Sequence, residues 1–130
     1  MLSHVHIGTN DFERAFAFYA PLMAALGLPL KFRNDEHGMA GWMPADAPRP
    51  LFLVGRPFDG GPAAPGNGNM VALLAPDRAL VSEVHALALS LGATSEGAPG
   101  LRPQYHANSF GAYLRDPDGN KLCICCHSPA

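Results

Sequence analysis

The chain has 130 residues, of which 48% are hydrophobic, and its nine basic and eleven acidic side chains give a formal charge of −2. This length suits one domain with a core of its own. The chain has no run of basic residues, so nucleic acid and anionic membranes are not expected partners. Apolar stretches stop well short of the ~20 residues of a membrane span, and the N-terminus lacks the pattern of a signal peptide, so we expect a cytoplasmic protein.

The first half of the chain predicts a strand, a helix and three short strands. Polar and apolar side chains alternate through residues 2–9, which places His4 and His6 on one face of a strand. Apolar side chains recur at helical spacing through residues 12–26, where Pro21 should bend the helix. The strands that follow fit "LPLKFR", "GMAGWM" and "PLFLVG".

The second half repeats this order. A strand, "NMVALLA", precedes a helix, "PDRALVSEVHALALSLG", and three strands, "ATSEG", "FGAYLRD" and "KLCICCH". When His4 is aligned with Met70, Asp11 falls on Asp77, and both aspartates are interpreted as helix-start residues. The repeat predicts two βαβββ units, neither of which closes a core alone. "DPDGN" is interpreted as the turn of the last hairpin.

Three cysteines lie within four positions near the C-terminus. Alternation along the last strand puts Cys123 and Cys125 on one face and Cys126 on the other. Because three is an odd number and the rest of the chain has no cysteine, we expect reduced thiols rather than a disulfide framework.

Three segments resemble the vicinal oxygen chelate superfamily, which includes glyoxalase I, bleomycin-resistance proteins and extradiol dioxygenases: "HVHIGTNDFERAFAFY", "GNGNMVALLAPDRALVSEVHALALSLGA" and "RPQYHANSFGAYLRDPDGNKLCICCH". The resemblance implies an α+β fold of tandem βαβββ modules, with eight strands in a cup-shaped mixed sheet. The modules would be residues 1–58 and 69–130, joined by a linker at residues 59–68. The resemblance also implies a homodimer.

The resemblance further implies a metal site on the first and last strands of each module, where relatives usually have His and Glu. The matching positions are His4, Phe52, Met70 and Cys123, with Phe52 taken as the repeat partner of Cys123. Met70 and Cys123 are poor replacements for His and Glu at a hard ion. We therefore expect a degenerate site and no cofactor. The alternative is a divalent metal (Zn, Ni or Fe) or a soft ion such as copper.

Further residues are predicted to line the cup. They are His6, Phe52, Tyr105, His106 and Cys125. For Tyr105 and His106 the alternative is a loop packed on itself, and for Met70 and Cys123 it is a role as core residues. His85 is predicted to lie on the surface. No residue is assigned a catalytic role.

Two function classes remain open. The first, which the ligand losses favour, is a bleomycin-resistance-like protein that binds a small organic molecule in the cup. The second is a metal-dependent enzyme, similar to lactoylglutathione lyase or to a dioxygenase, that acts on a small carbonyl or aromatic substrate.

Overall fold

The computed structural model describes residues 1–130 and confirms the predicted α+β fold. Strand, helix and three strands follow one another twice along the chain. The elements are β1 (His4–Gly8), α1 (Phe12–Ala25), β2 (Leu30–Asn34), β3 (Met39–Trp42), β4 (Leu51–Gly55), β5 (Val71–Leu74), α2 (Arg78–Ser90), β6 (Thr94–Leu101), β7 (Phe110–Arg115) and β8 (Lys121–Cys126). Neither helix is long and apolar enough to cross a lipid bilayer.

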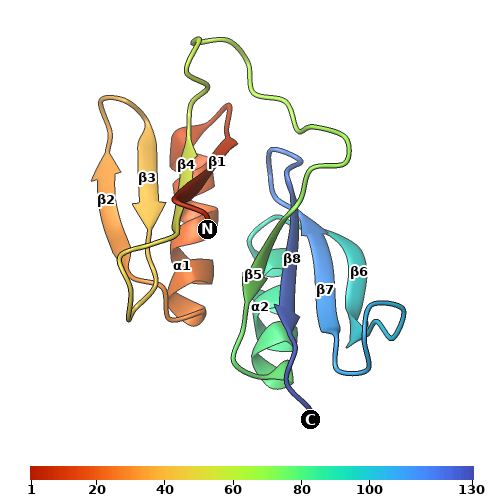
Figure 1. Cartoon of the computed structure of the whole chain (residues 1–130). Helices are drawn as coiled ribbons and strands as arrows, with labels where there is room; N and C mark the ends of the chain where they lie inside the picture. The colour runs from red at the N-terminus through yellow and green to blue at the C-terminus, as the bar shows by residue number, and fades with distance from the viewer.

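The eight strands are divided between two four-stranded sheets. Their orders are β1-β4-β3-β2 and β5-β8-β7-β6, so both halves have the same topology. In each sheet the first strand pairs with the fourth in parallel, and the other pairs are antiparallel. Figure 1 shows the sheets side by side, with α1 and α2 behind them. Strands β1 and β5 are edges with a single hydrogen-bonded neighbour each.

One hydrophobic core serves both modules. Its 20 buried residues come from both helices and from the sheet faces that the helices cover. Phe52 of β4 belongs to it, and its ring centroid lies 5.4 Å from that of Tyr19 in α1. Leu122, Ile124 and Cys126 of β8 belong to it as well. Cys123 and Cys125 are outside this cluster on the opposite face, as the alternation predicts.

Both helices begin at the aspartates that the repeat identified. The Asp11 carboxylate accepts a hydrogen bond from the backbone N–H of Arg14 at 3.0 Å, and that of Asp77 accepts one from Leu80 at 2.8 Å. Helix α1 continues through Pro21 without interruption. The two caps confirm the helix starts.

His85 corrects one expectation. It lies on α2 and is 6% exposed rather than on the surface, with its Nε2 3.2 Å from the hydroxyl oxygen of Ser95. Burial lowers its pKa. The cause is that α2 packs against β6 and β7, so this side of the helix faces the sheet. Strand β6 is eight residues long rather than the five of "ATSEG".

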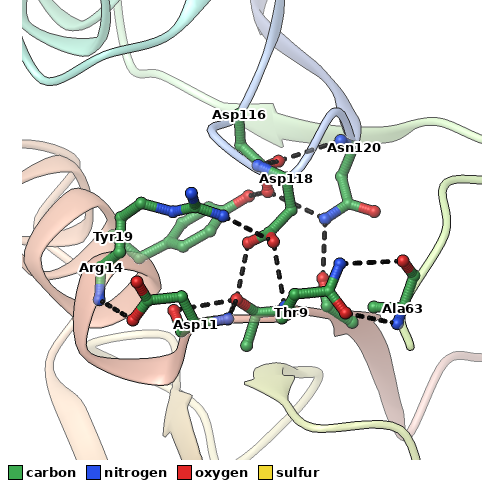
Figure 2. A network of polar contacts seen from close by, with 10 residues as sticks. Thr9, Asp11, Arg14, Tyr19, Ala63, Asp116, Asp118 and Asn120 are labelled. Carbon is green, nitrogen blue, oxygen red and sulfur yellow. Dashed lines mark hydrogen bonds and ion pairs between the residues drawn. The ribbon is translucent and has the colours of Figure 1, made fainter. Parts of the chain in front are cut away.

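The "DPDGN" turn joins the second module to the first (Figure 2). The Asp118 carboxylate, 3% exposed, accepts hydrogen bonds from the Thr9 hydroxyl at 2.6 Å and from the Asn10 backbone N–H at 3.0 Å. It also forms an ion pair with Arg14 at 2.9 Å. We call the contacts of this turn with the first module the inter-module clamp.

A second carboxylate of the turn completes the clamp. Asp116 accepts a hydrogen bond from the hydroxyl of Tyr19, which is fully buried in α1. Asn120 donates from its side-chain amide to Asp116 at 3.0 Å and to the carbonyl of Gly8 at 2.9 Å. Burial raises the pKa of Tyr19 well above its usual value, and the Asp116 charge adds to the effect.

Candidate functional site

The sheet face away from the helices carries two separate hollows. The first hollow, of about 680 Å³, lies over β1, β4 and the segment that follows β4. It is lined by His4, His6, Gly8, Met39, Leu53, Arg56, Pro57, Phe58, Asp59, Pro62, Ala63 and Ala64.

The second hollow, of about 400 Å³, lies over β5, β7 and β8 of the other module. Its wall is completed by the loop before β7 and by the segment after β8. It is lined by Met70, Ala72, Tyr105, His106, Ser109, Gly111, Tyr113, Lys121, Cys123, Cys125 and His127.

The sites predicted from the sequence are shared between these hollows. His4 and His6 lie together in the first, as their alternation on β1 predicts. The other predicted residues, except Phe52, line the second hollow: Met70, Tyr105, His106, Cys123 and Cys125. Within one chain the structure therefore does not bring His4 together with Met70 and Cys123. Met70 is 45% exposed at the wall of the second hollow, whereas Cys123 is 5% exposed.

Phe52 is not the repeat partner of Cys123. Strand pairing matches Phe52 with Val5 and Trp42, and its side chain lies in the core on the helix side. Leu53 pairs with Gly41, as Cys123 pairs with Tyr113 in the other module. Leu53 therefore occupies the equivalent position, because a shift of one residue along a strand reverses the face that a side chain occupies.

In the first hollow, His4 affects the titration of its neighbour His6. Burial lowers the pKa of His6, and the neighbouring charge of His4 lowers it further. The Nδ1 of His4 lies 2.9 Å from the hydroxyl of Ser3. His6 therefore releases its proton more readily than a free imidazole, which leaves it neutral at neutral pH.

The two thiols of the second hollow shift the pKa of one another in opposite directions. The neighbouring thiol of Cys123 is the main cause that lowers the pKa of Cys125, to about 6; burial opposes this shift, and His127 adds to it. The same interaction with Cys125, together with burial, raises the pKa of Cys123. Of the two thiols, Cys125 is therefore the one that ionises more readily.

A third hollow, of about 340 Å³, lies between the modules. We call it the inter-module hollow; 11 of its 13 lining residues are hydrophobic, and they come from the first module and from β5. Leu74 at the end of β5 is 68% exposed there. This surface is apolar and lies beside the edge strand β5.

The residues at the metal positions of the resembled fold do not fit a divalent ion. Those positions hold the imidazole of His4, the side chain of Leu53, the thioether of Met70 and the thiol of Cys123, whose pKa is raised. A thiol must lose its proton to coordinate a metal, and no carboxylate is present among the four. No group of three His, Cys, Asp or Glu side chains is arranged to hold a metal ion.

Six lining residues of the second hollow were missed by sequence reasoning, and three of them, Tyr113, Lys121 and His127, have side chains that can ionise. Tyr113 and Lys121 face the hollow from β7 and β8, with the Lys121 Nζ 5.6 Å from the Tyr113 ring centroid. Strand alternation could have found both, since Lys121 shares its face with Cys123 and Cys125. His127 follows the strand, so no periodicity indicates its direction.

A family model matches this chain over nearly its whole length. It is the model described as the Glyoxalase/Bleomycin resistance protein/Dioxygenase superfamily, and it covers residues 1–124. Among proteins of curated function, none matches.

The chain is also similar in structure to solved proteins. A glyoxalase/bleomycin resistance protein from Albidiferax ferrireducens T118 is 33% identical, with a TM-score of 0.84 over 98% of this chain and 99% of that one. A glyoxalase-related enzyme from Fulvimarina pelagi is 19% identical, with a TM-score of 0.72 over 97% and 87%. A lactoylglutathione lyase from Agrobacterium tumefaciens is 20% identical, with a TM-score of 0.64 over 97% and 92%. The last two likenesses concern the fold alone.

Proposed function

The chain belongs to the glyoxalase/bleomycin resistance protein/dioxygenase superfamily, and from that premise we propose that it binds a small organic molecule in the second hollow, with no metal ion at the degenerate positions. The lining of that hollow carries the proposal. Tyr105, Tyr113 and Met70 offer flat and apolar surface, and a few polar groups stand among them. Pockets for small molecules combine a mostly apolar wall with a few polar groups that orient the ligand.

The charges of the second hollow narrow the ligand class. Lys121 lines it, and the guanidinium carbon of Arg102 lies 5.3 Å from the Tyr113 ring centroid. No aspartate or glutamate lines this hollow. A ligand with an aromatic part against the tyrosines and an acidic group near Lys121 suits this arrangement.

Methionine methyl groups can test where a ligand binds, because the five methionines report on different places. Met70 lines the second hollow and Met39 the first, whereas Met23 is fully buried in the core. In protein carrying ¹³C-methyl methionine, titration with benzoate and 4-hydroxybenzoate should shift the Met70 signal and leave Met39 and Met23 in place. Shifts at Met39 without Met70 would refute the choice of hollow.

A charge variant sharpens this test. Lys121→Gln should weaken the binding of the carboxylates, because it removes the cationic side chain of the hollow. Lys31→Gln is the matched control, since Lys31 is exposed on β2 in the other module. Equal weakening by both variants would indicate a general charge effect and not this site.

The enzyme alternative has its own test. The hemithioacetal of methylglyoxal and glutathione, supplied with Ni²⁺ or Zn²⁺, should not be turned over, because the donor set described above does not fit those ions. Turnover that EDTA abolishes and added Ni²⁺ restores would replace the binding proposal with a lyase.

We also propose that two copies of the chain associate. The edge strands β1 and β5 and the apolar inter-module hollow are surfaces that a second copy would cover. The three free cysteines suit a reducing compartment such as the cytoplasm.

A further inference from the structure

A directed series of hydrogen bonds runs along the wall of the second hollow. It begins at the backbone N–H of Asn108, which lies 3.2 Å from the Nδ1 of His106. The Nε2 of His106 lies 2.9 Å from the Nδ1 of His127, and the Nε2 of His127 lies 3.7 Å from the Sγ of Cys125. The last distance is within the range of hydrogen bonds to sulfur, which are longer because the sulfur atom is larger than oxygen.

The backbone amide fixes the direction of the whole series. An amide N–H can only donate, so the Nδ1 of His106 accepts, and neutral His106 carries its proton on Nε2. That proton is donated to the Nδ1 of His127, so neutral His127 carries its own proton on Nε2. The N–H of His127 therefore points at the sulfur of Cys125. This arrangement favours a thiolate, which is the better acceptor.

Besides the groups of this series, the second hollow holds Lys121 of β8 and the phenols of Tyr113 and Tyr105. Cys123 is the titratable neighbour of Cys125 on β8, and His127 and His106 face it from the C-terminal segment and the loop before β7. Strand β5 presents the carbonyl of Leu73, to which the Cys125 thiol, while protonated, donates a hydrogen bond at 3.8 Å. This contact favours the thiol and opposes the effect of His127. Strand β7 presents Gly111, which pairs with Cys125 and has no side chain to block it.

The strand disfavours a disulfide between Cys123 and Cys125. Residues two apart on an extended strand have Cα atoms about 6.6–6.8 Å apart, which is the upper limit for a disulfide. Cys123 is therefore poorly placed as a disulfide partner of Cys125. A single activated sulfur then remains, at the wall of a hollow that admits a small molecule.

We propose that Cys125 is a nucleophilic cysteine, with His127 as its hydrogen-bond donor and His106 as the positioning residue, and that it adds covalently to α,β-unsaturated carbonyl compounds in the second hollow. The soft sulfur matches the soft β-carbon of such compounds. Lys121 and Tyr113, on the same wall, are donors suited to the carbonyl oxygen.

The step balances without an oxidant or a leaving group. The Cys125 thiolate forms a C–S bond to the β-carbon, and the electron pair of the C=C bond moves to the carbonyl as an enolate. Water then gives a proton to the α-carbon, and the hydroxide formed is neutralised by the proton that the thiol released on ionisation. The sum is the addition of one S–H across one C=C bond.

The proposal rests on the second hollow and not on the identity of the molecule bound there. The test is the reaction of the intact protein with methyl vinyl ketone at several pH values, followed by mass spectrometry. Fragmentation within the peptide that contains "LCICCH" distinguishes the three cysteines. A single adduct on Cys125 is expected, with a rate whose pH midpoint lies well below that of an ordinary thiol. A higher thiolate fraction, offset by lower intrinsic nucleophilicity, predicts a rate on the order of fivefold above free cysteine at pH 6.5.

Variants separate this activation from simple exposure. Cys125→Ser should abolish the adduct, and His127→Ala should raise the pH midpoint by about one unit. His106→Ala should raise it less, because His127 would keep its N–H but lose its fixed orientation. His4→Ala, in the first hollow, is the control and should change nothing. In protein unfolded by guanidinium chloride the three cysteines should react alike.

Several results would overturn the proposal. They are an adduct chiefly on Cys123 or Cys126, a pH midpoint at the value of an ordinary thiol, or a profile that His127→Ala leaves unchanged. The methionine signals keep this test apart from the proposed function. Carboxylate binding at Met70 without thiol reactivity would refute the nucleophile alone, whereas reactivity without such binding would refute the ligand class alone.

Discussion

The hydroxyl of Thr9 donates a hydrogen bond of 2.6 Å to the carboxylate of Asp118, although 109 positions separate the two residues in the sequence. Thr9 follows the first strand of the first module, and Asp118 lies in the last turn of the second. The bond is part of the inter-module clamp, whose strength can be measured.

Asp118→Ala should lower the free energy of unfolding by about 2–4 kcal/mol, because it leaves the Thr9 hydroxyl and the Asn10 N–H without their charged acceptor. Urea unfolding followed by circular dichroism measures the change. Asp46→Ala removes an exposed aspartate between β3 and β4 and should change stability by less than about 0.5 kcal/mol. Equal losses in the two variants would show that the clamp contributes little.

Tyr19 predicts a pH dependence on the alkaline side. Its pKa is raised in the folded state above the usual 10.0, so it holds its proton where the unfolded chain releases it. Its contribution to stability is therefore complete below pH 10 and declines as the pH rises further. Tyr19→Phe should cost about 1–2 kcal/mol at pH 8 and should show a weaker alkaline decline than the wild type. Parallel curves above pH 10 would contradict this.

The proximity of His4 and His6 predicts that removal of His4 changes the pKa of His6. Burial first, and His4 second, lower the pKa of His6 below 6.5 in the folded protein. Removal of His4 in His4→Ala should move the NMR titration midpoint of His6 upward, but not as far as 6.5, because the burial remains. His37→Ala, which removes an exposed histidine from the turn after β2, serves as the control. An unchanged His6 midpoint in His4→Ala would exclude coupling between the rings.

Self-association predicts a particle of twice 13.7 kDa in multi-angle light scattering. Leu74→Lys should shift it to the monomer mass, because it places a charge on the exposed part of the inter-module hollow. Leu89→Lys is the comparison, since Leu89 is also exposed but lies on α2. A monomer in the wild type at micromolar concentration would refute the dimer.

Local patterns predicted much of the fold. The helix starts at Asp11 and Asp77 depend on a hydrogen bond between residues three apart, and the faces of His4 and His6 depend on alternation within one strand. Both kinds of signal are complete within a few residues.

The features that could not be predicted depend on the exact register of the strands and on contacts between segments far apart in the sequence. Phe52 was placed one residue from the position equivalent to Cys123, and an error of one residue exchanges the core for the hollow. The burial of His85 depends on the packing of α2 against β6 and β7. The residues of the "DPDGN" motif predict a turn alone, because nothing in them indicates that Asp118 contacts Thr9.

The inter-module clamp also affects how the protein is made. The ribosome releases Thr9, Asn10 and Arg14 before their common partner Asp118, which follows them by 109, 108 and 104 residues. Until Asp118 has been synthesised, the first module lacks these contacts and part of the common core. The two modules therefore cannot fold one after the other during synthesis, and a ribosome that stalls before Asp118 holds an unfinished fold that is a substrate for chaperones and proteases.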